Sequence, residues 1–138
     1  MPMTREEIDT FLAEARLCAL ATVDERGRPR VRPLWYLWRD GAFWFTTRLE
    51  ARHTGRDLAV SPRVAVSVAS EERPYRAVVA HGHPEVVGKN EELLLAISTR
   101  YGQAQGRTWT TQVMEEPDRV VLRMTPQTLI SWDYGRDD

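Results

Sequence analysis

The chain has 138 residues, of which 42% are hydrophobic, and a formal net charge of −1. This length suits one domain, over residues 1–138, with a small core, and the near-neutral charge provides no global field for nucleic acid or an anionic membrane. The single cysteine excludes an intrachain disulfide. Because the amino terminus lacks a signal-peptide pattern and no apolar run approaches the ~18 residues of a membrane span, we expect a cytoplasmic protein with no membrane partner.

The first 27 residues predict a capped helix, a strand and a turn. Thr4 and Glu7 have the spacing of a capping box, and apolar residues then recur at helical spacing, so we expect a helix over residues 4–15. A compact apolar run predicts a strand over residues 17–23. Gly27 closes a turn in which it is free to adopt positive φ.

The next segment reads as a β-hairpin over residues 28–38 and 42–47, joined at Asp40-Gly41, the strongest short hairpin signal in the chain. Side chains alternate between the two faces of a strand, so the arginines of its first strand share one face. A row of guanidinium groups suits a phosphate or a carboxylate, although a solvated face is the competing interpretation. The arginines are Arg28, Arg30 and Arg32.

The remaining elements mix strands and helices without regular alternation. We expect helices over residues 49–60 and 90–101, a loop over residues 102–106, and strands over residues 63–69, 75–87, 118–124 and 129–134. Residues 108–114 fit either a short helix or an irregular excursion. Six or seven strands with inserted helices favour an α+β fold built on a mainly antiparallel barrel. A barrel this small encloses little space, so a cofactor-sized ligand would lie in a cleft or at a subunit seam.

A second basic cluster falls where the third strand passes into the following helix. Thr46 and Thr47 end the strand, and the helix begins near Arg52, His53 and Arg56. Free amides at a helix start, its dipole and nearby hydroxyls form a ready anion site. Glu50 and Asp57 also allow the alternative of a partly neutralised, solvated helix face.

Other reactive residues have simpler interpretations. Cys18 lies in an apolar run, which predicts a buried, inert thiol. His81 and His83 share a strand face with Glu85, but ligands in a row on one strand splay apart, so we expect no metal site. Trp132, near the carboxyl end, is a candidate for closing a planar-ligand pocket or packing at a dimer seam.

The order of several short motifs resembles the pyridoxamine 5'-phosphate oxidase-like split β-barrel family of flavin and deazaflavin oxidoreductases. Each motif is weak alone, but they occur in family order over nearly the whole chain. They are the segment 20–29, Arg32-Pro33-Leu34-Trp35-Tyr36, the segment 40–47, Ala51-Arg52-His53 with Asp57-Leu58, the segment 61–68, the segment 82–87, Thr125-Pro126 and Ser131-Trp132-Asp133.

The resemblance implies an FMN-binding split-barrel homodimer with two cofactor sites at the seam. It implies that the cofactor phosphate is held by residues around the third strand and the following helix, and that the ring lies along the backbone of the second strand. The cofactor-binding residues on this reading are Arg30, Arg32, Pro33, Leu34, Trp35, Thr46, Thr47, Arg52, His53, Arg56 and Trp132.

Three functions remain open at this stage. The first is an oxidoreductase that binds FMN and acts on a small-molecule substrate, the cofactor supplying the chemistry, which would explain why no catalytic triad or acid–base pair is evident. The second uses a deazaflavin coenzyme, whose longer acidic tail would require a basic track. The third is a flavin- or haem-binding module without turnover. The residues available for the track are Arg28, Arg30, Arg48 and Arg56.

Overall fold

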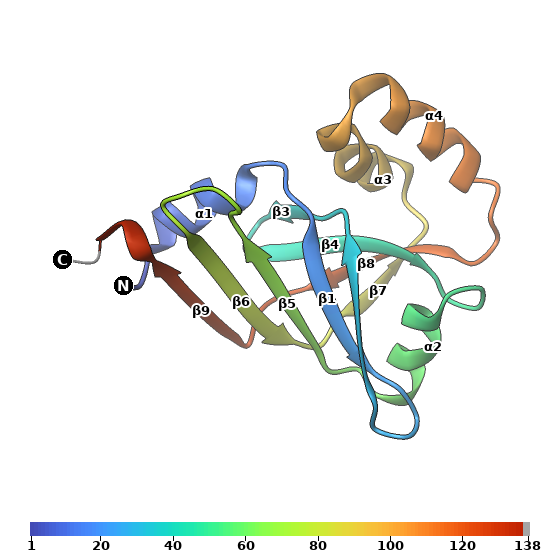
Figure 1. Ribbon diagram of the computed structural model, residues 1–138. Helices are drawn as coiled ribbons and strands as arrows, with labels where there is room; N and C mark the ends of the chain where they lie inside the picture. The colour runs from blue at the N-terminus through green and yellow to red at the C-terminus, as the bar shows by residue number, and fades with distance from the viewer. Residues whose placement is uncertain (137–138) are drawn as a thin grey trace.

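Two antiparallel sheets form the body of the molecule in the computed structural model, which describes residues 1–136. The five-stranded sheet has the strand order β2-β1-β5-β6-β9 and the four-stranded sheet the order β3-β4-β8-β7. Figure 1 shows α1 and α2 near opposite ends of the sheets, with α3 and α4 packed side by side. The α+β split-barrel class expected from the sequence is therefore confirmed.

The described elements follow one another along the chain without a long unstructured segment. The strands are β1 (Cys18–Val23), β2 (Pro29–Leu34), β3 (Leu37–Arg39), β4 (Ala42–Arg48), β5 (Val64–Ala69), β6 (Arg76–Gly82), β7 (Glu85–Gly88), β8 (Arg119–Met124) and β9 (Thr128–Asp133). The helices are α1 (Arg5–Ala13), α2 (His53–Val60), α3 (Glu91–Ser98) and α4 (Gln103–Val113), with 3-10 turns η1 (Thr99–Tyr101) and η2 (Tyr134–Arg136). None of these helices is long and apolar enough to cross a membrane.

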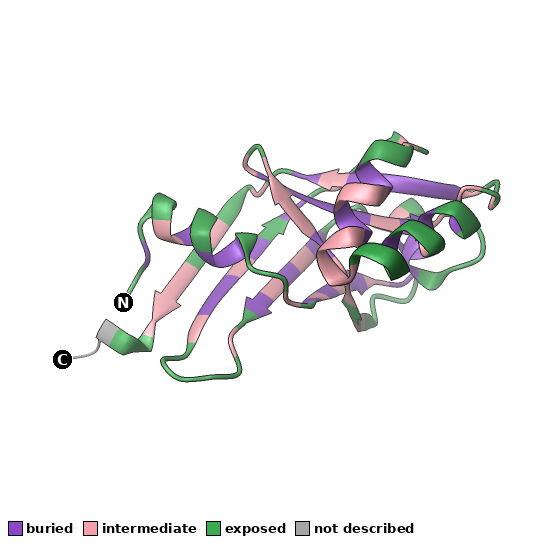
Figure 2. Cartoon of the chain, turned by 90° about the horizontal axis from the view of Figure 1, so that it is seen from above, coloured by how far each residue is buried: buried purple, intermediate pink, exposed green. Residues whose placement is uncertain are grey.

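Strand alternation builds the main core between the sheets. Along β1 and β5 every second side chain is buried, and Figure 2 shows the resulting bands of buried and less buried residues. These inward side chains pack with Phe11 of α1, Phe45 of β4 and Leu122 of β8. A second cluster, which includes Leu94 and Ile97 of α3, fills the space between the four-stranded sheet and the α3–α4 pair. The barrel interior is thus filled by side chains, so a ligand must bind outside it.

The outward side of the five-stranded sheet carries small and apolar side chains, and we call it the outer face. Cross-strand neighbours run across it from Pro33 through Ala19, Ser67 and Val79 to Ile130. Figure 1 shows this sheet with no helix in front of it. Ile130 on one edge strand is 52% exposed, and Val31 on the other edge strand is 68% exposed.

The arginine-rich segment expected as one strand over residues 28–38 is two strands, β2 and β3, in different sheets. Between them the Tyr36 side chain is fully buried, and its hydroxyl donates a 2.9 Å hydrogen bond to the Leu12 carbonyl. The Tyr36 amide donates to the Tyr101 hydroxyl at 3.0 Å instead of to a strand. The prediction of one strand was wrong because these distant partners draw the chain from one sheet into the other.

The strand expected over residues 75–87 is likewise two, β6 and β7, which again lie in different sheets. Gly82 ends β6 where a Cβ atom would lie 2.8 Å from the Met124 sulfur, and Pro84, which has no amide hydrogen, follows two residues later. The chain therefore leaves the five-stranded sheet at Gly82 and enters the other sheet as β7. Within residues 1–136 there are nine strands instead of the expected six or seven, because two segments each cross between the sheets.

Two helix boundaries also differ from the expected ones. The helix expected over residues 49–60 begins only at His53, because the amides of residues 49–51 donate to Asp118 instead of to a helical turn. The loop expected over residues 102–106 belongs mostly to α4. Gly106 allows that helix to pass close to α3, since a Cβ atom there would lie 2.7 Å from the Ser98 carbonyl carbon.

Candidate functional site

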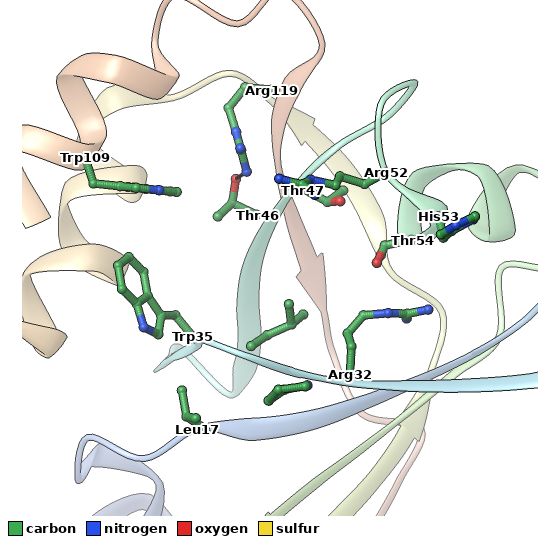
Figure 3. A pocket seen from close by; sticks show the side chains of 12 residues that line it. Leu17, Arg32, Trp35, Thr46, Thr47, Arg52, His53, Thr54, Trp109 and Arg119 are labelled. Carbon is green, nitrogen blue, oxygen red and sulfur yellow. Dashed lines mark hydrogen bonds between the residues drawn. The ribbon is translucent and has the colours of Figure 1, made fainter.

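A cleft of about 510 Å³ lies where the two sheets separate, between β2 and β4. β2 is an edge strand, so one side of its backbone has no sheet partner within the described chain. Figure 3 shows side chains entering the cleft from β2, from β4, from the start of α2 and from α4. The lining residues are Leu17, Arg32, Pro33, Leu34, Trp35, Thr46, Thr47, Arg52, His53, Thr54, Trp109 and Arg119.

One end of the cleft, the cationic end, consists of Thr47, Arg52, His53 and Thr54 (Figure 3). Arg52 is the N-cap of α2, and its side chain makes no capping hydrogen bond. Thr47 and Thr54 are 6% and 5% exposed, so their hydroxyls belong to a largely buried wall. The first amides of a helix lack intrahelical acceptors and favour an anion. Hydroxyls, amides and a guanidinium group therefore converge here as a phosphate site requires.

The other two arginines of the cleft are paired with carboxylates. Arg32 donates to the Thr22 hydroxyl at 2.9 Å and lies 3.6 Å from Asp57. Burial lowers the pKa of the Arg32 guanidinium, and Asp57 opposes that shift. Arg119 donates two hydrogen bonds to Glu116 Oε1, at 3.0 and 2.8 Å. Among residues 1–136, Arg52 is thus the cleft guanidinium that no carboxylate neutralises.

The opposite end, the aromatic end, consists of Leu17, Trp35 and Trp109. The Trp35 ring stacks on Tyr101 with centroids 5.1 Å apart and planes 7° apart. Its centroid lies 5.3 Å from that of Trp109, with the two planes at 67°. Figure 3 shows both indoles on the side of the cleft away from His53. A flat apolar wall of this kind suits a planar conjugated ring.

Most of the residues proposed from the sequence come together in this cleft. They are Arg32, Pro33, Leu34, Trp35, Thr46, Thr47, Arg52 and His53. Arg30 and Arg56 instead line a neighbouring depression together with Asp24, Asp57 and His53. Trp132 lies on β9, at the edge of the five-stranded sheet opposite β2, and pairs with Ala77, so it does not line the cleft of its own chain.

Four lining residues were not proposed from the sequence. Thr54 is the second residue of α2, and the helix-start argument that selected Arg52 also applies to it. Trp109 and Arg119 come from α4 and β8, far along the chain from the hairpin, and nothing local to them indicates a cleft. Leu17 lies just before β1 and is 55% exposed, which is the one feature that marks it as unusual for an apolar residue.

The basic track expected for a longer anionic tail is largely neutralised. Arg28 Nε lies 2.8 Å from Asp24, Arg30 Nε lies 3.1 Å from Asp57, and Arg48 Nε lies 2.8 Å from Asp118. These carboxylates belong to the turn after β1, to α2 and to the residue just before β8. Three of the four arginines available for such a track are therefore already paired with buried carboxylates.

The cysteine and the strand histidines lie outside the cleft. Cys18 is 2% exposed, and burial raises the pKa of its thiol to about 12, as expected for an inert side chain. His81 Nδ1 lies 3.1 Å from the Thr128 hydroxyl and His83 Nδ1 lies 3.3 Å from the Gln127 amide nitrogen. Both histidines face a separate depression that also contains Arg63.

A sequence model of the family described as pyridoxamine 5'-phosphate oxidase matches residues 4–133. The chain therefore belongs to this family, and the resemblance seen in its motifs is confirmed. The search of functionally curated proteins finds no match.

Solved structures show the same fold. The conserved hypothetical protein Rv2991 from Mycobacterium tuberculosis matches with a TM-score of 0.80 and 26% identity, over 96% of this chain and 86% of its own. An F420 reductase matches with a TM-score of 0.71 and 26% identity, over 88% and 94%. HutZ, the heme storage protein of Vibrio cholerae, matches with a TM-score of 0.69 and 24% identity, over 91% and 92%.

Proposed function

We propose that this chain is an oxidoreductase that binds FMN non-covalently in the cleft. The proposal rests on the position and free charge of Arg52. It is a guanidinium without a carboxylate partner among the described residues, and it stands beside two buried threonines at one end of a cleft whose other end is aromatic. A phosphate and a planar ring, held at opposite ends of one molecule, match these two chemistries. The volume of about 510 Å³ lies within the usual range for a small-molecule site.

Each end of the cleft has its own task in this proposal. Arg52, Thr47, Thr54 and the first amides of α2 hold the phosphate, since charge-assisted hydrogen bonds are the stronger kind. Trp35 and its neighbours on β2 cover one face of the ring and keep water from it. When bound, FMN supplies the electron or hydride transfer, and the protein supplies binding, orientation and electrostatics. The substrate in this proposal is a small molecule that reaches the ring from the open side of the cleft.

The active form in this proposal is a homodimer that associates through the outer face. Pro33 lies both in the cleft and at the end of the outer-face row that leads to Ile130. A second copy on this face would therefore adjoin the cleft and supply a further wall. Trp132 lies on the same face, so its proposed cofactor contact would be made with the site of the other copy.

A deazaflavin coenzyme is the second candidate, favoured by the match to the F420 reductase at 26% identity. Its acidic tail would meet Arg56, for which no ion pair is found among residues 1–136, but the other arginines of the expected track already have carboxylate partners. Because few free arginines remain for an acidic tail, we rank FMN ahead of the deazaflavin coenzyme. A non-catalytic haem- or flavin-binding module is the third candidate, and the match to HutZ at 24% identity supports only the shared fold.

A ligand screen on the purified apoprotein tests the proposal. FMN, riboflavin, a deazaflavin coenzyme and haem are titrated separately and followed by absorbance and fluorescence. We expect saturable FMN binding that is tighter than riboflavin binding, and reduction of the complex by a nicotinamide donor. Preference for the deazaflavin would establish the second candidate, and a Soret band with no flavin binding would establish a haem protein. Light scattering that gives the mass of one chain would contradict the homodimer.

A further inference from the structure

The turn between β4 and α2 delivers Arg52 to the cleft, and it is held by Asp118, which directly precedes the neighbouring strand β8. The Leu49 amide donates to the Asp118 carbonyl at 3.0 Å. The next two amides, of Glu50 and Ala51, donate to Asp118 Oδ2 at 3.1 and 3.0 Å. Three successive backbone donors before Arg52 therefore end on Asp118, which itself does not line the cleft.

Two further contacts leave this turn little freedom. Arg48 Nε donates to Asp118 Oδ1 at 2.8 Å, so both carboxylate oxygens are used and the side chain is only 9% exposed. On the other side, Gly55 of α2 lies so close to the turn that a Cβ atom would be 2.5 Å from the Leu49 Cα atom. Partial burial would raise the pKa of Asp118, but the hydrogen bonds from Arg48 and the turn amides outweigh it and lower this pKa to about 2. The Asp118 carboxylate, which clamps the turn, is thus charged at physiological pH.

We propose that Asp118 is a positioning residue for the cationic end: by fixing the backbone of residues 49–51 it aims the Arg52 side chain at the phosphate of the bound ligand. The inference rests on the proposed FMN site. Within residues 1–136, no side-chain hydrogen bond or ion pair orients the Arg52 guanidinium. Its direction is therefore set by the backbone that precedes it, and that backbone is set by Asp118.

The charge of Asp118 makes the test decisive, because two explanations predict opposite changes in FMN affinity when that charge is removed. Asp118→Asn removes a negative charge near the phosphate, and Coulomb's law alone predicts tighter binding of an anionic ligand. Positioning predicts weaker binding, since asparagine cannot accept hydrogen bonds from Arg48 and from the turn amides with both of its terminal atoms. Riboflavin, which lacks the phosphate, reports any general damage to the cleft.

The chain offers a closely matched control in Asp24. This carboxylate also accepts two backbone amides, from Arg26 and Arg28, each at 2.9 Å, and an arginine Nε at 2.8 Å. It is buried to a similar degree, with its side chain 5% exposed, and it does not line the cleft. Asp24→Asn therefore removes the same charge and the same kind of turn clamp at another place.

The experiment measures dissociation constants of FMN and riboflavin for the parent, Asp118→Asn, Asp24→Asn and Arg52→Ala apoproteins by fluorescence titration. We expect Asp118→Asn to weaken FMN binding by about tenfold, of the order of one charge-assisted hydrogen bond, and to change riboflavin binding less than about twofold. Asp24→Asn should leave the ratio of the two affinities unchanged.

Unchanged or tighter FMN binding by Asp118→Asn, or an equal loss for both ligands, would overturn the positioning role. Failure of the proposed function has a different signature. In that case the parent protein does not prefer FMN to riboflavin, or Arg52→Ala keeps the preference, and the inference is then overturned together with the site on which it rests. Circular dichroism of each variant confirms that the affinities refer to folded protein.

Discussion

Arg52→Ala separates phosphate recognition from every other contribution to cofactor binding. The substitution removes one guanidinium that the proposed function places on the phosphate. A lost hydrogen bond to a charged group costs about 1–3 kcal/mol, or roughly 5- to 150-fold in affinity. Since Arg52 is exposed, solvent and salt screen the contact, and we expect a loss in the lower half of that range. Riboflavin binding should change little.

The stability of the fold should survive this change, for reasons visible in the structure. Arg52 makes no side-chain capping hydrogen bond, so alanine leaves the start of α2 intact. Truncation also leaves no buried carboxylate without a partner, because no ion pair of Arg52 is found in the part of the chain described. The free energy of unfolding should therefore stay within about 0.5 kcal/mol of the parent value.

The assay is fluorescence titration of both flavins, with Arg56→Ala as the control. Arg56 lies one helical turn later on α2, has no ion pair among residues 1–136 and lines the neighbouring depression instead of the cleft. Arg56→Ala changes the net charge by the same amount as Arg52→Ala. It therefore measures how much of the loss in FMN affinity comes from long-range electrostatics. Equal losses for Arg52→Ala and Arg56→Ala, or equal losses for FMN and riboflavin, would refute direct phosphate contact by Arg52.

Three more outcomes follow from burial and close packing. Cys18, whose thiol has its pKa raised to about 12 by burial, should resist a maleimide at pH 8 in the native protein and react after denaturation; rapid native labelling would contradict the buried strand. Ile130→Glu places a charge on the outer face and should yield a monomer in light scattering with weakened FMN binding, whereas a persistent dimer would show that the subunits associate elsewhere. Gly55→Ala forces a Cβ atom to 2.5 Å from the Leu49 backbone and should destabilise the fold by about 1–3 kcal/mol in urea unfolding; a neutral effect would show that the turn yields easily.

Features governed by neighbouring residues were predicted well from the sequence. Thr4 caps α1 through the reciprocal hydrogen bonds expected of a capping box. Asp40 and Gly41 have φ angles of 55° and 71°, as a tight hairpin requires. The strand expected over residues 63–69 is β5, and its Val66 side chain is 1% exposed. In each case the determining interaction spans only a few residues, so the pattern contains all the necessary information.

Features governed by distant partners were not predicted. The break between β2 and β3 depends on Tyr36 meeting Tyr101, 65 residues away. The late start of α2 depends on Asp118, which binds the amide of Glu50 across 68 residues. Alternation and propensity describe what a segment prefers by itself, whereas these elements end where a side chain from elsewhere takes over their backbone hydrogen bonds.

The distribution of carboxylates explains why the arginines of β2 indicated the cleft less well than the basic cluster at the start of α2. Arg32 has only 20% of its side chain exposed, and a guanidinium removed from water to that extent requires a partner in the protein itself. Asp57 is that partner, and its own 2.8 Å hydrogen bond from the Thr22 hydroxyl ties α2 to β1. Arg32 therefore serves to hold the helix in place beside the cleft.

Arg52 differs from Arg32 because it lies at the exposed rim, where water can solvate its charge while no ligand is bound. Only an arginine in such a position can be left without a carboxylate at small cost to folding, and only such an arginine retains its full donor capacity for an incoming phosphate. The row of alternating arginines therefore marks the support of the site, and the single arginine before the helix marks the proposed contact. A search for ligand-binding arginines in related chains should accordingly begin with those that border a cleft and lack a carboxylate within reach.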